Sequence, residues 1–215
     1  METILGIDLG TTNSEVAIIR DGRPVVLPDE EGDPIFPSAV GIDAQGRLLV
    51  GRAARNQFVL APDRTVLSIK RRMGEETTVT LGTQKYTPQE ISAIILRALK
   101  QRAEKSLGYE VKKAVITVPA FFNEGQRAAT REAGELAGLE VVRIINEPTA
   151  AVLTYDPHPP EMERLLVYDL GGGTFDVSIA QVEGGSSRSS PATATPTSAA
   201  TISTNGSSTS SPIDS

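Results

Sequence analysis

The 215-residue sequence lacks cysteine and has a single histidine, His158, in a proline-rich stretch. Disulfide bonds are therefore excluded, and so are metal sites built from histidine and cysteine. No apolar run approaches the roughly 20 residues that a membrane-spanning helix needs, and the N-terminus lacks the pattern of a signal peptide. These absences predict a soluble, cytoplasmic protein with no membrane partner.

The sequence also lacks an excess of basic residues. Its 21 Lys and Arg are outnumbered by 27 Asp and Glu, which gives a net charge of -6 and a pI near 5.0. Sequence-independent binding to nucleic acid relies on clustered Lys and Arg. The only basic run is KRR at residues 70–72, a pattern that is typical of a solvated face. We therefore expect no nucleic-acid partner.

Apolar residues make up 39% of the chain, but they are scarce in its C-terminal part. In residues 186–215, Ser and Thr fill 17 of 30 positions, and the only charged residues are Arg188 and Asp214. Such a segment lacks the apolar surface that could offset the entropy lost on ordering. The sequence therefore predicts a folded part over residues 1–185 and a disordered Ser/Thr-rich tail over residues 186–215.

Two segments far apart in the chain share one pattern. DLGTTNSEVAII, from Asp8, and DLGGGTFDVSIA, from Asp169, each follow an apolar strand with an Asp-Leu-Gly step, a small polar turn and a second strand. Val16 and Val177 stand at the same offset in the two copies. This pattern predicts two β-hairpins of common origin that face each other across a ligand. Chance similarity between two glycine-rich hairpins is the alternative.

Strand and helix signals alternate between these hairpins. The clearest helix covers residues 88–107, because Thr87 and Glu90 form a capping box, Pro88 takes the first helical position and Gly108 supplies the stop. Its predicted buried stripe consists of Ile91, Ile94, Ile95, Ala98 and Leu99. Strands are predicted over 114–122 and 140–145, and helices over 124–138 and from 148. This order predicts an α/β domain with a mixed sheet and flanking helices.

Each hairpin turn combines groups that suit phosphate. Glycine lets the backbone approach a ligand and point N–H groups at it, and both turns contain glycine, at Gly10 and at residues 171–173. Asp8 and Asp169, at the strand ends, suit a hydrated divalent cation, and Mg²⁺ commonly joins carboxylates to substrate phosphates. Two facing turns of this kind predict a site for a nucleoside triphosphate and its metal.

Two commoner nucleotide motifs are missing. The sequence has no G-x-x-x-x-G-K-[ST], which excludes a P-loop. It has no G-x-G-x-x-G that opens a helix either, since the GGG at residues 171–173 leads into a strand, and this argues against a dinucleotide site.

Several segments resemble the signature sequences of the seventy-kilodalton heat-shock chaperones of the DnaK type. They are IDLGTTNS (7–14), KRRMG (70–74), AVITVPAFFNEGQRAATREAG (114–134), RIINEPTAA (143–151) and VYDLGGGTFDVSI (167–179). The resemblance covers residues 1 to about 185 in the family's order. It implies an actin-like ATPase (ribonuclease H-like) fold, of which the chain carries the first lobe only, with an outer subdomain inserted at about residues 38–110.

The resemblance implies a role for each matching residue. The implied phosphate-binding positions are Gly10, Thr11, Thr12, Gly171, Gly172, Gly173 and Thr174. Asp8, Glu147 and Asp169 match carboxylates that hold Mg²⁺ mostly through water, and Asp169 is also a candidate to orient the attacking water. Lys70 matches a catalytic lysine, whose charge stabilises negative charge developing near the γ-phosphate. The implied catalytic set is therefore Lys70, Asp169, Glu147 and Asp8.

The resemblance also implies coupling residues and partners. Pro119 and Arg127 match residues that relay the nucleotide state to a peptide-binding domain. The implied cofactors are ATP or ADP and Mg²⁺, with K⁺ as a further ion. The implied partners of the full-length family are unfolded peptides, a J-domain co-chaperone and a nucleotide-exchange factor. Spacing alone would favour simpler interpretations: Lys70 in a solvated basic run, Glu147 as a carboxylate at a helix start and Pro119 as a strand terminator.

The chain departs from this family after Gly185. In the family, the first lobe is followed by a second lobe with the adenosine pocket and then by a peptide-binding domain and its lid. Residues 186–215 resemble none of these parts. A smaller departure lies within the outer subdomain, where the stretch from Glu75 to Lys85 is shorter than in many relatives. If the reading frame is moved by one nucleotide, the codons for Thr195 to Ser207 can encode the string DTHLGGDDFDQRL. This string resembles the segment that follows the second phosphate-binding turn in the family. We interpret residues from about Ser186 as a frameshifted translation of a chaperone gene.

Three functions therefore compete. The first is ATP binding and hydrolysis by one lobe of a chaperone ATPase, with weakened nucleotide affinity because the cleft does not close. The second is an inert or interaction-only fragment that exposes an apolar face normally covered by the second lobe. The third is another actin-like protein, a sugar kinase or a filament ATPase, and the NEPTAA and KRRMG segments argue against it.

Overall fold

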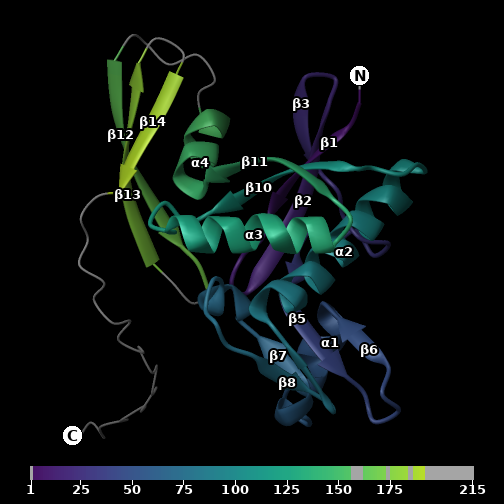
Figure 1. Ribbon diagram of the computed structural model, residues 1–215. Coiled ribbons are helices and arrows are strands. Elements are labelled where there is room, and N and C mark those ends of the chain that lie inside the picture. Colours follow the sequence, from purple (N-terminus) through teal and green to yellow (C-terminus); the bar gives the residue numbers. More distant parts are fainter. Residues whose placement is uncertain (1, 156–161, 173–174, 184–185, 192–215) are drawn as a thin grey trace, which may run out of the picture.

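The computed structural model describes residues 2–155, 162–172, 175–183 and 186–191 (Figure 1). Its central element is a mixed six-stranded sheet with the order β11-β10-β1-β2-β3, in which β4 also pairs with β2. β1, β10 and β11 run parallel, while β1, β2 and β3 form an antiparallel meander. The strands are β1 (Ile4–Asp8), β2 (Asn13–Arg20), β3 (Arg23–Val26), β4 (Phe36–Pro37), β10 (Lys113–Val118) and β11 (Glu140–Asn146). The predicted mixed sheet is confirmed.

Helix α2 (Pro88–Leu107) begins and ends at the predicted residues. The Thr87 side chain accepts a hydrogen bond from the Glu90 backbone N–H, and the Glu90 carboxylate accepts one from the Thr87 N–H at 2.7 Å. Gly108 ends the helix with a left-handed φ of 80°. The predicted stripe faces the core: Ile91, Ile95 and Leu99 are fully buried, and Ile94 and Ala98 are partly buried.

Helices α3 (Glu124–Leu136) and α4 (Glu147–Tyr155) follow β10 and β11. Asn123 and Gln126 form a capping box at the start of α3, which runs across the sheet in Figure 1. Gly134 allows α3 to approach β11, because a Cβ there would lie 2.3 Å from a methyl carbon of Val141. Helix α4 begins at Glu147, so its first carboxylate lies directly after the end of β11.

A smaller layer lies below the main sheet in Figure 1 and connects β4 to α2. It contains a three-stranded sheet, a two-stranded sheet and short helices: β5 (Ala39–Ile42), β6 (Leu48–Val50), α1 (Arg52–Gln57), η1 (Pro62–Arg64), β7 (Thr65–Leu67), η2 (Ile69–Arg72), β8 (Val79–Leu81) and β9 (Gln84–Tyr86). Helix α2 contacts both α3 and β5, so it joins this layer to the main sheet. Buried residues of both layers belong to one continuous core.

The second predicted hairpin forms a separate sheet. Strands β12 (Met162–Leu170) and β13 (Phe175–Glu183) pair antiparallel, and β14 (Ser186–Pro191) pairs with β13. Figure 1 shows this sheet beside α4, apart from the six-stranded sheet. Leu165, Val167 and Ala180 pack on Val152 of α4.

Strand β14 corrects one prediction. Disorder was expected from Ser186, yet Ser186–Pro191 forms a strand. The physical reason is that the free edge of β13 offers unpaired backbone N–H and C=O groups. A neighbouring segment can pair with these groups through its own backbone, without apolar side chains. The remainder of the predicted tail, residues 192–215, lies outside the described residues.

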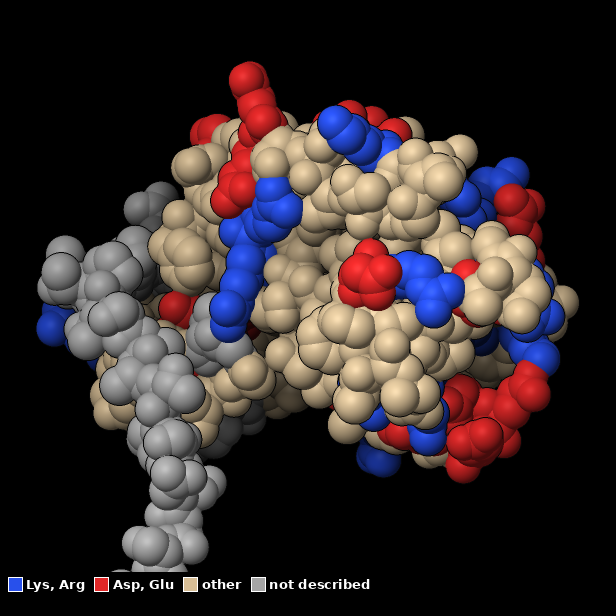
Figure 2. Space-filling model, turned by 90° about the horizontal axis from the view of Figure 1, so that it is seen from below, with Lys and Arg blue, Asp and Glu red and all other residues tan. Residues whose placement is uncertain are grey.

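The described surface carries mixed charge. On the face shown in Figure 2, the acidic and basic side chains drawn in colour alternate in small groups and form no continuous basic surface. Within the described part of the chain, no helix is both long and apolar enough to span a membrane.

Candidate functional site

The two hairpins have the same register around their turns. Asp8, at the end of β1, pairs with Glu15 of β2, and Asp169 of β12 pairs with Asp176 of β13. Each turn therefore begins after an aspartate that stands opposite a second acidic residue. This is the correspondence expected of a duplicated hairpin.

Hydrogen bonds around Gly10 fix the first turn. The Gly10 N–H donates to Ser14 Oγ at 3.2 Å, Ser38 Oγ donates to the Gly10 carbonyl at 2.8 Å, and the two hydroxyl oxygens lie 2.9 Å apart. Because Ser38 gives its hydrogen to Gly10, Ser14 must donate to Ser38. The Ser38 N–H donates to the Thr12 carbonyl at 2.9 Å. Both serines are buried, so the turn is fixed from beneath.

The second turn lies directly against the first. A Cβ on Gly172 would lie 2.6 Å from Oγ1 of Thr12, so this approach requires glycine. Gly10 is restricted as well, because a Cβ there would lie 2.0 Å from the Asn13 carbonyl oxygen. Thr11 and Gly171 lie in the same two turns, whereas Gly173 and Thr174 lie outside the described residues. The structure thus places Gly172 of the second turn directly against Thr12 of the first.

A cavity of about 350 Å³ opens beside these turns, between β1, β10, α4 and β12. Its polar lining consists of Asp8, Thr117, Glu147, Thr154, Tyr168 and Asp169. The carboxylates of Asp8 and Asp169, 161 positions apart in the sequence, therefore share one hollow.

Lys70 reaches the same region from η2. Its Nζ lies 2.5 Å from Oε1 of Glu147, and its side chain is only 9% exposed. The interpretation of Lys70 as part of a solvated basic run is therefore wrong, because burial and pairing separate it from the exposed Arg71. This buried ion pair connects the smaller layer to the first residue of α4.

Burial and like charge shift the titration of the acidic residues. Burial raises the pKa of Glu147, and the charges of Asp8 and Asp169 raise that pKa further; Lys70 opposes the increase without cancelling it. The pKa of Asp176 is also raised, first by burial and then by the charge of Asp169. The site therefore concentrates negative charge that a cation would stabilise.

Arg127 ties the loop after β10 to the end of β11. Its guanidinium donates to the carbonyls of Ala120 and Phe122 and to Oδ1 of Asn146, the last at 2.8 Å. Pro119 directly follows β10, as expected of a strand terminator. Since Asn146 precedes Glu147, the Arg127 side chain contacts the backbone neighbour of the buried ion pair.

Sequence reasoning missed three supporting residues. Thr117 lies opposite Asp8 in the parallel pair β1–β10 and donates to Oδ1 of Asp8 at 2.9 Å. Asp176 could have been found from the repeat, because it occupies the position of Glu15. Ser38 gave no signal, since its contact with Gly10 joins segments 28 residues apart.

Comparison with known proteins identifies the family. The model of the Hsp70 protein family matches residues 4–81 and 76–198. The chain belongs to the Hsp70 family. It is 56% identical over 183 residues to chaperone protein DnaK of Thermotoga petrophila, and 56% identical over 186 residues to chaperone protein DnaK of Thermotoga neapolitana.

These Hsp70 relatives are much longer than this chain. The alignments cover 84% and 86% of the chain but 31% of each relative, so the chain spans about a third of their length. Both hairpin turns, Lys70 and Glu147 lie inside the matched ranges. The second match continues to residue 198, past the predicted boundary at Gly185. Membership of the Hsp70 family decides against the sugar-kinase and filament alternatives.

Proposed function

We propose that this chain carries the phosphate-binding and magnesium-binding part of an Hsp70 ATPase domain. The observation that supports this best is the contact between the two glycine turns, Thr12 against Gly172, beside a cavity shared by Asp8 and Asp169. Facing backbone turns with adjacent carboxylates suit a polyphosphate and its cation. The family to which the chain belongs is a family of ATPases.

The donor set fits ATP with Mg²⁺. Residues 10–12 and 171–174 would bind phosphate oxygens from opposite sides, and Asp8, Glu147 and Asp169 would hold the metal. Among the described residues, no three acidic side chains lie close enough together to bind an ion directly. Mg²⁺ retains several of its waters in such sites, so binding of the carboxylates through water is the arrangement we propose. Bound Mg²⁺ neutralises charge on the phosphates.

Lys70 and Asp169 would act on the γ-phosphate and the attacking water. The Lys70 ammonium has three donors, so it can keep its bond to Glu147 while another N–H contacts phosphate. Its burial strengthens the stabilisation of negative charge, because less water screens it. Asp169 accepts hydrogen bonds only, which suits it to orient a water molecule.

The remaining roles concern the longer protein. We propose that Arg127 and Pro119 relay the nucleotide state from Glu147 toward a peptide-binding domain, through the contact of Arg127 with Asn146. By family membership we propose a cytoplasmic chaperone with unfolded peptides, a J-domain co-chaperone and a nucleotide-exchange factor as partners, and K⁺ as a further ion.

We also propose that residues from about Ser186 are a frameshifted continuation. Support comes from the hidden string DTHLGGDDFDQRL over residues 195–207. Sequencing of the gene decides this: codons that cannot encode the string in the neighbouring frame would rule the idea out.

Calorimetric titration of the chain with ATP and Mg²⁺, together with release of labelled phosphate, tests the proposed function. We expect weak binding, and loss of about 100-fold in turnover for Lys70→Met. Lys85→Met is the matched control, because Lys85 is exposed in β9, and it should leave both quantities unchanged. No binding heat and no turnover in the unaltered chain would favour the inert fragment instead.

A further inference from the structure

The Thr117 hydroxyl contacts one of the carboxylates proposed to bind the metal. Thr117 stands opposite Asp8 in the parallel pair of β1 and β10, and its Oγ1 donates a hydrogen bond to Oδ1 of Asp8 at 2.9 Å. The direction of this bond is fixed, because a carboxylate only accepts hydrogen bonds and the hydroxyl has a single hydrogen. The bond therefore occupies one oxygen of Asp8 and leaves the other, Oδ2, for a ligand.

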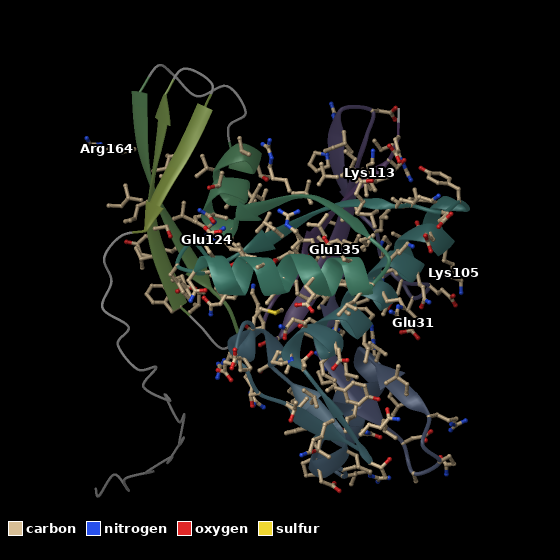
Figure 3. The ribbon with its side chains drawn as sticks, in the orientation of Figure 1. Glu31, Lys105, Lys113, Glu124, Glu135 and Arg164 are labelled. Carbon is tan, nitrogen blue, oxygen red and sulfur yellow. The ribbon has the colours of Figure 1, made fainter. Side chains whose placement is uncertain are left out.

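The side of β10 that carries Thr117 leads to the cavity. Side chains alternate along a strand, so Lys113, Val115 and Thr117 share one side, and all three are partly buried. Lys113, which is labelled in Figure 3, lies at the beginning of β10 and pairs with Glu2 at 2.7 Å. Thr117 lies at the other end of this row and lines the cavity together with Asp8. Of the three residues, Thr117 is therefore the one that can act on the site.

Threonine is a rigid donor at this position. Its branched Cβ restricts χ1, so the backbone of β10 determines where the hydroxyl points. Asp8, in contrast, is an exposed residue at the end of β1, where an unrestrained carboxylate would sample several rotamers. The hydrogen bond from Thr117 selects one of them.

Other acidic residues surround Asp8. Glu15 pairs with it across β1 and β2, and Glu147 and Asp169 line the same cavity. Without a restraint, repulsion between these charges would favour rotamers that turn the Asp8 carboxylate into solvent. The bond to Thr117 opposes that rotation and keeps the carboxylate in the cavity.

We propose that Thr117 is the positioning residue for the metal-binding carboxylate of Asp8. This inference rests on the proposed function, because it concerns the same Mg²⁺ site. Removal of a hydrogen-bond partner behind a metal ligand commonly weakens metal binding by roughly 10- to 100-fold. Since Asp8 is proposed to bind the metal through water, loss of the Thr117 hydroxyl should weaken binding by about tenfold, the lower end of this range.

Thr117→Val isolates the hydroxyl, because valine keeps the shape of threonine and its preference for a strand. The probe is Mn²⁺ with ADP, and water-proton relaxation distinguishes Mn²⁺ bound to the full chain from free Mn²⁺–ADP. We expect about tenfold weaker binding in Thr117→Val and recovery to within about twofold in Thr117→Ser, which restores the donor. Thr80→Val, which alters an exposed threonine of β8, is the control and should leave the affinity unchanged. Calorimetry with ADP and a chelator should give equal affinities for all these chains, whereas general damage to the fold would weaken this metal-free binding too.

Two measurements test whether Thr117 acts through Asp8. In Asp8→Ala, the additional change Thr117→Val should have no further effect on Mn²⁺ binding, because the carboxylate that it positions is gone. In the metal-free chain, three-bond NMR couplings of Asp8 should report a single χ1 rotamer, and an average over several rotamers in Thr117→Val.

The results distinguish failure of this inference from failure of the proposed function. If the unaltered chain binds Mn²⁺ no more tightly than Asp8→Ala does, the metal site itself is wrong and the inference falls with it. If Asp8→Ala weakens binding but Thr117→Val does not, the proposed function stands and the positioning role of Thr117 is overturned. A single Asp8 rotamer in Thr117→Val, or a full effect of Thr117→Val in the Asp8→Ala chain, would overturn it as well.

Discussion

Replacement of Ser38 by alanine tests how the first turn is held. The Ser38 hydroxyl donates to the Gly10 carbonyl and accepts from Ser14, so Ser38, which lies between β4 and β5, contacts the first hairpin at residues 28 and 24 positions away. Ser38→Ala removes both bonds and leaves the Gly10 carbonyl and the Ser14 hydroxyl without these partners. Since Ser14 is buried and Gly10 is partly buried, we expect a loss of about 2–4 kcal/mol in the free energy of unfolding.

Urea denaturation and calorimetry measure this loss. For a chain of this size, 1 kcal/mol shifts Tm by roughly 2–4 °C, so Tm should fall by about 4–16 °C. Ser106→Ala is the matched control, because Ser106 is exposed on α2, and it should change stability by less than about 0.5 kcal/mol.

A double-mutant cycle with Ser14→Ala identifies the source of the effect. Ser14 and Ser38 share one hydrogen bond, so the double variant should lose about 0.5–3 kcal/mol less than the sum of the single variants. Strict additivity, or a Ser38→Ala loss below about 0.5 kcal/mol, would refute the closed arrangement around Gly10.

Three further predictions concern titration, capping and packing. The pKa of Glu147 is raised in the folded state, so its contribution to stability is complete below the unfolded pKa near 4.5 and is lost as the pH rises through the raised value. NMR of the Glu147 carboxyl should show a titration midpoint above pH 4.5, and the midpoint should be higher still in Lys70→Met, because the charge that lowers the pKa is removed. A midpoint at or below pH 4.5 would contradict the argument that burial raises this pKa. Thr87→Ala removes the capping box of α2 and should cost about 1 kcal/mol in urea denaturation, and an unchanged midpoint would mean that the cap contributes nothing. Gly134→Ala forces a methyl group against Val141 and should destabilise the chain by about 1–3 kcal/mol, unless α3 can move away from the sheet without loss.

Local signals predicted much of the fold correctly. The capping box and terminal glycine of α2 lie within a few residues of the helix they delimit, so their effect can be read without tertiary structure. The same holds for the two hairpins, whose turns are short and whose registers agree. Strand β14 was not predicted, because edge pairing depends on a free neighbouring strand, which composition does not reveal.

The sequence by itself determined the repeated Asp-Leu-Gly hairpins, the principal helices and the set of acidic and glycine residues at the turns, because these depend on local chain chemistry. Only the tertiary structure decided that Thr12 meets Gly172, that Thr117 donates to Asp8 and that Lys70 is buried against Glu147. These contacts join residues 77 to 160 positions apart, and their distances are fixed by how the sheets and layers pack. The physical reason is that periodicity specifies which side of a strand or helix is apolar, whereas packing specifies which side chains then meet.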